Sequence, residues 1–275
     1  MVRIELLTVG RELLIGRTLN TNAYWIGGRL ARTGTMLSRV ETVDDDLGEI
    51  SAALHGTFER RADFVVVVGG LGPTPDDMTL KGVAKALKSK LRTSAVALGM
   101  VKRRYDEVGR GRVKMTKERM KMALIPEGAT PLGNEWGMAP GVRLEAGSAV
   151  VFCLPGVPRE MRGIFLRRVE PEIKAKLGDL WRSGVRLRIE GVYESDLAPL
   201  IKKQAEEHPG AYIKSHPRGV KEGISELELD AVVVKRTAAD ADSEIGEIAS
   251  AFTAWVERNG GSVVQLKESR TGNRS

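Results

Sequence analysis

The chain alternates between short apolar runs and longer segments in which apolar residues recur every three to four positions. The clearest apolar run is Phe64–Val68, in which one phenylalanine is followed by four valines. β-Branched residues favour strands, and an uninterrupted apolar run is typical of a strand whose sheet is covered on both faces. This run therefore predicts a buried strand of a parallel sheet.

The first 170 residues predict strands and helices in alternation. Apolar residues recur with helical spacing at Trp25, Ile26 and Leu30 and, further on, at Ile50 and Leu54. Strands that alternate with helices imply right-handed crossovers and a three-layer α/β/α sandwich. We expect strands at Arg3–Val9, Thr35–Val43, Phe64–Val68 and Ser148–Leu154, and helices at Asn22–Thr33, Leu47–Arg60, Leu80–Lys88, Ala95–Glu107, Lys114–Ala123 and Arg159–Val169, with the Gly- and Arg-rich connection Val108–Val113 before the fifth of them.

After residue 170 the alternation is replaced by fewer, longer elements. We expect strands at Val185–Tyr193 and Glu226–Lys235, and helices at Asp196–Glu207 and Ala238–Asn259. This pattern predicts a smaller α+β domain. The expected organisation is an α/β domain at 1–170, the α+β domain at 171–266, and a polar, frayed tail at 267–275.

Composition narrows the class of protein. Hydrophobic residues make up 42% and charged residues 29% of the 275 positions, which is typical of a globular chain. No apolar run is long enough to span a membrane, and the N-terminus lacks the apolar stretch of a signal peptide, so we expect a cytoplasmic protein. The lone Cys153 lies in an apolar run and predicts an inert, buried thiol.

The net charge of +7 favours anionic partners such as nucleotides or nucleic acids. Aromatic residues are only 5% of the chain, which is poor material for stacking bases, so a small anionic ligand is the better expectation.

The loop after Phe64–Val68 carries the strongest chemical signal. It contains Gly69, Gly70 and Gly72, and the carboxylates Asp76 and Asp77 follow. Glycines let the main chain approach a ligand closely, and backbone N–H groups at a helix N-terminus can hold an anion. Carboxylates beside a phosphate suggest a divalent metal or a base that activates water. The alternative is a Gly-Pro turn in which Asp or Thr caps the next helix.

Two further loops follow strands and are expected at the same edge of a parallel sheet. The first, Thr8–Asn22, contains two glycines and two asparagines, and its alternative role is to cap the next helix through Asn20 or Thr21. The second, Asp44–Asp46, is acidic, and its alternative is a solvated first turn of a helix. Two acidic clusters that face one pocket would suit a metal or a general base.

The stretches Pro131–Gly141 and Leu154–Met161 are dense in Gly and Pro. They could form an irregular loop that closes over a ligand. The alternative is a structural hairpin before the strand at Ser148–Leu154.

Together these segments resemble the N-terminal part of the CinA (competence/damage-inducible protein A) family and the wider molybdopterin-binding fold of molybdenum cofactor (MoCF) biosynthesis, shared with molybdopterin adenylyltransferases. Five motifs occur in order between Gly10 and Met161. They are Gly10-x-Glu12-Leu-Leu-x-Gly16 with Asn20-Thr-Asn22, Val43-x-Asp45-Asp46, Gly69-Gly70-Leu-Gly72-Pro-Thr74-x-Asp76-Asp77, Asn134-x-x-Gly137-x-Ala-Pro140-Gly141, and Leu154-Pro-Gly156-x-Pro-x-Glu160-Met161.

The resemblance implies a pterin- or nucleotide-binding domain of three α/β/α layers. The two aspartates essential in adenylyltransferase relatives map onto Asp45 and Asp77, which are also our candidates for a Mg²⁺, Mn²⁺ or Co²⁺ site. CinA relatives imply a metal-dependent pyrophosphatase for ADP-ribose-like dinucleotides. The implied ligand-binding residues are Gly10, Glu12, Asn20, Asn22, Gly69, Gly70, Gly72, Thr74, Asp76, Asn134, Gly137, Pro140, Gly141, Gly156 and Glu160.

Two departures from the family pattern matter. Arg11 stands where relatives carry Asp or Asn, which changes the charge beside Glu12. The sequence also ends in a part that resembles the family's KH-like domain, without the amidase domain of full-length CinA proteins, so no amidase activity is expected. The wider fold includes dimers and trimers, which makes a homo-oligomer one expectation.

A third interpretation is an RNA-binding or scaffold protein. KH modules clamp RNA with a GxxG loop, and the nearest stretch here, Pro217–Gly223, is not a clear basic version of it. We therefore rank RNA binding below pterin or nucleotide chemistry.

Overall fold

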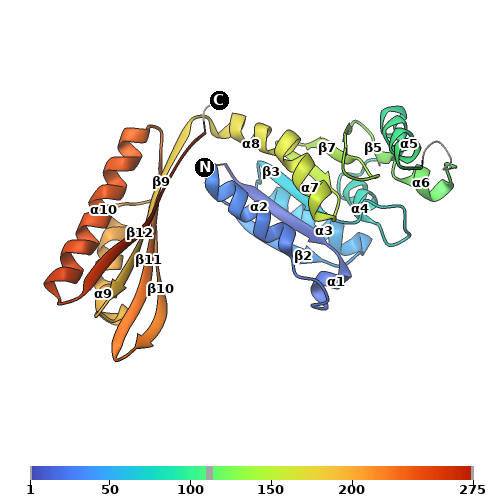
Figure 1. The fold of residues 1–275 in the computed structure, drawn as a ribbon. Helices are drawn as coiled ribbons and strands as arrows, with labels where there is room; N and C mark the ends of the chain where they lie inside the picture. The colour runs from blue at the N-terminus through green and yellow to red at the C-terminus, as the bar shows by residue number, and fades with distance from the viewer. Residues whose placement is uncertain (1, 110–113, 274–275) are drawn as a thin grey trace. The chain divides into compact units, whose positions relative to one another are not determined.

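The structure, a computed structural model, describes residues 2–109 and 114–273. It divides into two compact units, which we call the first unit (1–30 and 35–176) and the second unit (31–34 and 177–275). The predicted connection Val108–Val113 falls largely on residues 110–113, outside the described residues, as do 274–275 of the predicted tail. Figure 1 colours the chain from blue at the N-terminus to red at the C-terminus.

The first unit is built on a six-stranded sheet in the order β2-β1-β3-β8-β7-β6. The strands β2, β1, β3 and β8 are parallel, as the βα alternation predicted, and β7 and β6 are antiparallel. The α/β class is confirmed, and the stretch before β8 is the hairpin we gave as an alternative. The strands are β1 Ile4–Val9, β2 Arg39–Val43, β3 Phe64–Val68, β6 Thr130–Leu132, β7 Gly141–Ala146 and β8 Ala149–Leu154.

Most predicted helices of the first unit are present within a few residues of their expected bounds. They are α2 Thr21–Arg32, α3 Leu47–Glu59, α4 Thr79–Ala86, α5 Ala95–Gly109, α6 Lys117–Lys121 and α7 Pro158–Ile164. The short helix α1 Arg11–Leu14, in the loop after β1, was not predicted. A π-helical turn, η1 Phe165–Val169, connects α7 to α8 Glu170–Leu177. A small antiparallel pair, β4 Leu91–Thr93 and β5 Leu124–Pro126, was not predicted.

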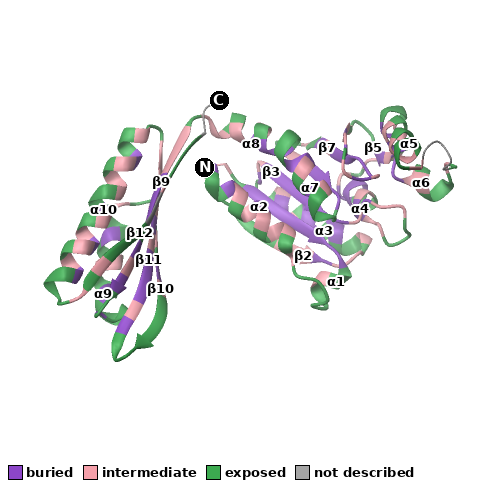
Figure 2. Ribbon diagram, viewed as in Figure 1, coloured by how far each residue is buried: buried purple, intermediate pink, exposed green. Residues whose placement is uncertain are grey.

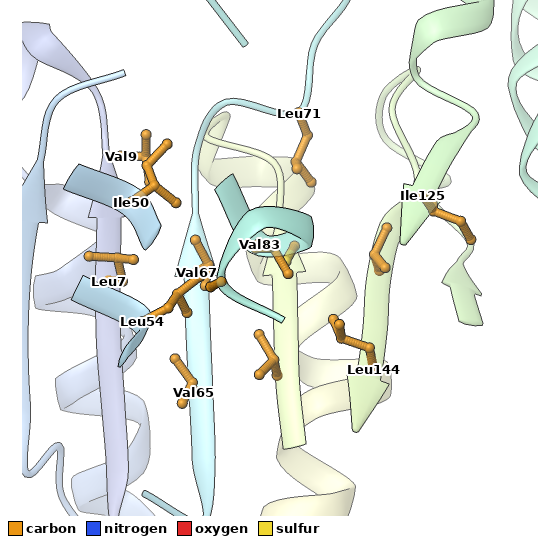
Figure 3. Packing of buried hydrophobic residues seen from close by; sticks show 14 of the residues in the cluster. Leu7, Val9, Ile50, Leu54, Val65, Val67, Leu71, Val83, Ile125 and Leu144 are labelled. Atoms are coloured by element: carbon orange, nitrogen blue, oxygen red, sulfur yellow. The ribbon is translucent and has the colours of Figure 1, made fainter. Parts of the chain in front are cut away.

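The core of the first unit lies on both faces of the sheet. Every residue of β3 is buried, so side chains that point to either face are covered (Figure 2). On one face Leu7, Val65 and Val67 pack with Leu54 of α3 and Val83 of α4 (Figure 3). This packing fixes the strands, and hence the loops at their carboxyl ends.

The second unit is a four-stranded antiparallel sheet in the order β10-β11-β9-β12, with two helices. Phe252 and Val256 of α10 belong to one core cluster with Leu187 of β9 and Leu229 of β11. The elements are β9 Leu180–Glu190, α9 Glu194–Glu207, β10 Tyr212–Lys221, β11 Ile224–Lys235, α10 Ala238–Arg258 and β12 Ser262–Asn273.

Two strands of this unit, β10 and β12, escaped the sequence analysis. The prediction of a frayed tail is wrong over residues 267–273, because these residues continue β12 and pair with β9. Their polar side chains give no apolar pattern that predicts a strand, whereas the strand is held by backbone hydrogen bonds to its neighbour in the sheet. The stretch Pro217–Gly223 lies in β10 and in the tight turn to β11, with Glu222 and Gly223 at positive φ. In the described ranges, no helix has the length and apolar character needed to cross a lipid bilayer.

Candidate active site at the carboxyl edge of the sheet

The loops after β1, β2 and β3 meet at one edge of the sheet, which we call the carboxyl edge. Gly10 N donates to Val43 O at 3.1 Å, and Arg11 N donates to Asp45 Oδ2 at 3.0 Å. A Cβ at Gly69 would lie 2.2 Å from Val9 O. The structure therefore brings together the glycine-containing and acidic segments that we expected at this edge.

Asp45 is a carboxylate of the carboxyl edge whose pKa is raised, whereas the pKa values of Asp44 and Asp76 are lowered. Partial burial raises the pKa of Asp45 above its usual value, the Arg11 N–H opposes this, and the negative charges of Glu12, Asp44 and Asp76 raise the pKa further. The interaction with Asp76 means that the acidic segment after β2 faces the loop after β3. A cation here would relieve the repulsion among the carboxylates.

Asp46 has a different role from Asp45. Its side chain accepts hydrogen bonds from Gly48 N and Glu49 N and caps α3. For Asp46, the structural alternative that we gave for the acidic run is therefore confirmed.

Arg11 compensates Asp44. Its guanidinium forms a two-pronged hydrogen bond with that carboxylate, at 2.7 Å from Nη2 to Oδ2, and this bond lowers the pKa of Asp44. Glu12 stays exposed, and its Oε1 would lie 2.6 Å from a Cβ added at Gly10. Asp44 chiefly raises the pKa of Arg11, and the charges of Asp45 and Glu49 add to this, so the guanidinium also offsets part of the negative charge at Asp45.

The glycine loop, residues 69–78, connects β3 to α4. Gly69 and Gly70 have φ of 112° and 62°, a region that favours glycine, and Thr79 Oγ1 donates to Gly69 O at 2.7 Å. Asp77 accepts hydrogen bonds from Thr74 N at 2.8 Å and Thr74 Oγ1 at 2.6 Å.

No side chain caps the N-terminus of α4, which begins at Thr79. The alternative in which Asp or Thr caps this helix is therefore wrong. Asp77 folds the glycine loop through one carboxylate oxygen, and Asp76 is exposed.

Lys121, at the end of α6, lies at the candidate site and was missed by the sequence analysis. Its Nζ donates to Thr74 O, and a small pocket is lined by Gly70, Gly72, Asp77 and Lys121. Burial lowers the pKa of Lys121, and the charge of Asp77 opposes this. The segment 114–121 contains three lysines, and their spacing in the sequence does not indicate which of them contacts the glycine loop.

Asn20 and Asn22 hold the neighbouring loops. Asn20 Oδ1 accepts from Ala23 N at 3.0 Å, which supports its alternative role at the start of α2, and its Nδ2 donates to Thr8 Oγ1 at 3.0 Å. Asn22 Nδ2 donates to Gly156 O at 2.7 Å. A Cβ at Gly156 would lie 3.5 Å from Gly69 Cα, so the loop after β8 also reaches the carboxyl edge.

Asn134, Gly137, Ala139 and Glu160 form a hydrogen-bonded group that we call the Asn134 cluster. Asn134 Nδ2 donates to Ala139 O at 2.8 Å and to Glu160 Oε2 at 2.7 Å, and Asn134 Oδ1 accepts from Gly137 N at 3.0 Å. A Cβ at Gly137 would lie 1.9 Å from Glu160 Oε2. These contacts fix the loop internally.

Pro140 and Gly141, the other two residues assigned to this loop, are buried, and Gly141 opens β7. Their observed contribution is to the packing of the sheet edge.

The donors of the carboxyl edge suit a hard cation only in part. Carboxylate oxygens are what Mg²⁺ and Mn²⁺ prefer, and Asp45 supplies one in a repulsive surrounding. Over the described ranges, no group of three or more His, Cys, Asp or Glu side chains is gathered as metal ligands. A cation here would complete its shell with water or ligand phosphate, as Mg²⁺ commonly does.

A larger groove lies in the second unit, between α9 and β10. Glu194, Lys202 and Ser215 line it, and none of the predicted site residues does.

A mostly parallel α/β sheet with a glycine loop and converging carboxylates at its carboxyl edge defines a ligand-binding α/β domain. Residues 5–175 match the family described as probable molybdopterin binding domain, and the chain belongs to this family.

Relatives extend over nearly the whole chain. A protein from Aeropyrum pernix is 41% identical over 263 residues, 95% of this chain and 96% of that protein. Protein Ta0487 from Thermoplasma acidophilum is 38% identical over 265 residues, 94% of this chain and 100% of that protein. A solved structure described as the protein CinA with unknown function, from Thermoplasma acidophilum, is 42% identical with a TM-score of 0.57, covering 62% of this chain and 96% of that chain.

Proposed function

We propose that this chain is a metal-dependent hydrolase of phosphorylated small molecules, with ADP-ribose-type dinucleotides as the first candidate substrates. The observation that carries the proposal is Asp45. Its partly buried carboxyl lies within the electrostatic range of Glu12 and Asp76, beside a loop whose backbone can approach a phosphate. Such a concentration of negative charge suits a divalent cation that bridges protein and phosphate.

In this proposal each group has a separate task. Gly69, Gly70 and Gly72 of the glycine loop bind the pyrophosphate through backbone N–H groups. Asp45 and Asp77 would hold Mg²⁺, Mn²⁺ or Co²⁺, and such a cation would lower the pKa of bound water. Asp76 or Glu12 orients the attacking water. Attack on phosphorus breaks the P–O–P bond and releases AMP and ribose 5-phosphate from ADP-ribose.

Product release from a panel of ADP-ribose, NAD, ATP and dinucleotides tests the proposal. Each compound is incubated with Mg²⁺, Mn²⁺ or Co²⁺, and in parallel with EDTA. AMP that forms only with metal supports the hydrolase and names its substrate. No turnover of any compound under any metal would contradict it.

The second candidate is molybdopterin binding, with or without its adenylation by ATP. The family match over residues 5–175 favours it. The two candidates differ in ligand preference: this one predicts tighter binding of molybdopterin than of ADP-ribose, measured by competition, and the reverse order would count against it.

A further inference from the structure

Lys121 is a positive group that faces the candidate active site from a distant part of the sequence. It ends α6, and its Nζ donates to Thr74 O of the glycine loop. Asp77 and Asp76 attract it electrostatically, and Lys81 repels it. Asp77, Lys81 and Lys121 line the small pocket beside Gly70 and Gly72.

Among the described residues 114–121, the cations other than Lys121 are engaged elsewhere or exposed. Arg119 donates to Lys114 O, and its guanidinium lies 4.6 Å from the ring centroid of Tyr105. Lys117 is exposed at the start of α6. Lys121 differs because it is half-buried against the glycine loop.

Lys121 can offset part of the negative charge that the carboxyl edge presents to a phosphate. Glu12, Asp45, Asp76 and Asp77 would repel a phosphate, and one divalent cation offsets only part of that charge. An ammonium group has three N–H donors, and the bond to Thr74 O uses one of them. The remaining donors can reach a phosphate oxygen at the glycine loop.

We propose, on the basis of the proposed function, that Lys121 binds a phosphate of the ligand and so selects phosphorylated over unphosphorylated compounds. Asp77 positions it, because this carboxylate fixes Thr74, whose carbonyl receives the lysine. The ligand class is a pyrophosphate-containing nucleotide or a phosphorylated pterin.

The test compares Lys121→Met, Lys121→Arg and the control Lys117→Met in the full chain. Affinities for inorganic pyrophosphate, ADP-ribose and adenosine are measured by calorimetry at low and high salt. We expect Lys121→Met to weaken binding of both phosphate probes about 10- to 100-fold, the range expected for a hydrogen bond to a charged group. Lys121→Arg should recover part of the loss, Lys117→Met should match the wild type, and adenosine binding should not change.

Each other outcome overturns the inference in a recognisable way. Equal pyrophosphate affinity in Lys121→Met and wild type would remove the phosphate contact while leaving the proposed hydrolase intact. An equal loss for adenosine would mean that Lys121 only holds the loop. Wild-type protein that bound neither phosphate probe would overturn the proposed function, and this inference with it. Melting temperatures of the variants check that each is folded.

Discussion

The carboxyl edge and the Asn134 cluster were both predicted to bind ligand, and the structure gives them different characters. In the Asn134 cluster, the side chain of Asn134 bonds to backbone and carboxylate partners within the loop. At the carboxyl edge, Asp45 is crowded by Glu12 and Asp76 and has one N–H donor, from Arg11. Satisfied polar groups stabilise a fold, whereas like charges held together are typical of functional sites.

The comparison teaches that a dense motif does not by itself identify the residues that do chemistry. Glycine serves both regions for steric reasons: at Gly137 it leaves room for Glu160, and at Gly69 it leaves room for Val9 O. What separates the regions is the charge around each carboxylate: Glu12, Asp44 and Asp76 surround Asp45, whereas Glu160 receives the amide of Asn134. Variants can test whether this difference predicts function.

The largest expected effect is on turnover in Asp77→Asn. The amide keeps an oxygen that accepts from Thr74 N, so the glycine loop should stay folded while the charge needed for the cation is lost. We expect metal-dependent AMP release to fall at least about 100-fold, with an unchanged melting temperature. Full activity in this variant would remove the proposed mechanism.

The next effect concerns the backbone of the carboxyl edge. Gly69→Ala should cost more than about 3 kcal/mol of unfolding free energy, because φ is positive and the new Cβ would clash with Val9 O. Gly156→Ala is the matched control, with its nearest neighbour at 3.5 Å, and should change stability by less than about 0.5 kcal/mol. Urea unfolding measures both, and equal stability of the two variants would contradict the close approach at Gly69.

Asn134→Ala should also act on stability, and not on ligand binding. It leaves Gly137 N, Trp136 N and Ala139 O without their partner, at an expected cost of about 2–3 kcal/mol. At a temperature where the variant is folded, its affinity for pyrophosphate should equal that of the wild type. A stable variant that had lost affinity would place the Asn134 cluster in the binding site.

The smallest effect is the pH dependence of stability through Asp45. Because folding raises the pKa of Asp45, the folded state holds this proton more tightly than the unfolded state. The resulting stabilisation is complete below the usual carboxyl pKa of 3.8 and is lost as pH rises through the raised value. The free energy of unfolding of Asp45→Asn minus that of the wild type should therefore be larger at pH 7 than at pH 3.5. The difference should be small, because solvent screens the site. Denaturant unfolding at both pH values measures this change, and a change of opposite sign would contradict the repulsion.

The sequence was sufficient for the α/β architecture and for the carboxyl edge. Apolar runs such as Phe64–Val68 identify buried strands by composition alone, and parallel strands bring their carboxyl ends to one edge. The strands β10 and β12 escaped prediction, and the antiparallel strands β6 and β7 were foreseen only as an alternative hairpin, because the partners of these strands are set by register across the sheet. Local pattern does not encode that register.

The candidate site was predictable only as a list of loops. Gly10, Asp45 and Gly69 follow neighbouring parallel strands, so the topology places them at one edge of the sheet, and the structure shows them there. The internal role of Asn134 and the inward turn of Lys121 depend on side-chain packing between segments far apart in the chain. No spacing rule predicts such contacts. Asn134 was therefore predicted to bind ligand, and Lys121 was not predicted at all.

The most direct test of the central claim is a titration with Mn²⁺ in the presence of ADP-ribose, followed by electron paramagnetic resonance. The wild type is compared with Asp45→Asn and Glu160→Gln, two acid-to-amide changes, one from each region. If the carboxyl edge is the functional site, Mn²⁺ binding is lost in Asp45→Asn and retained in Glu160→Gln. Retention in Asp45→Asn with loss in Glu160→Gln would contradict the account and assign the site to the Asn134 cluster.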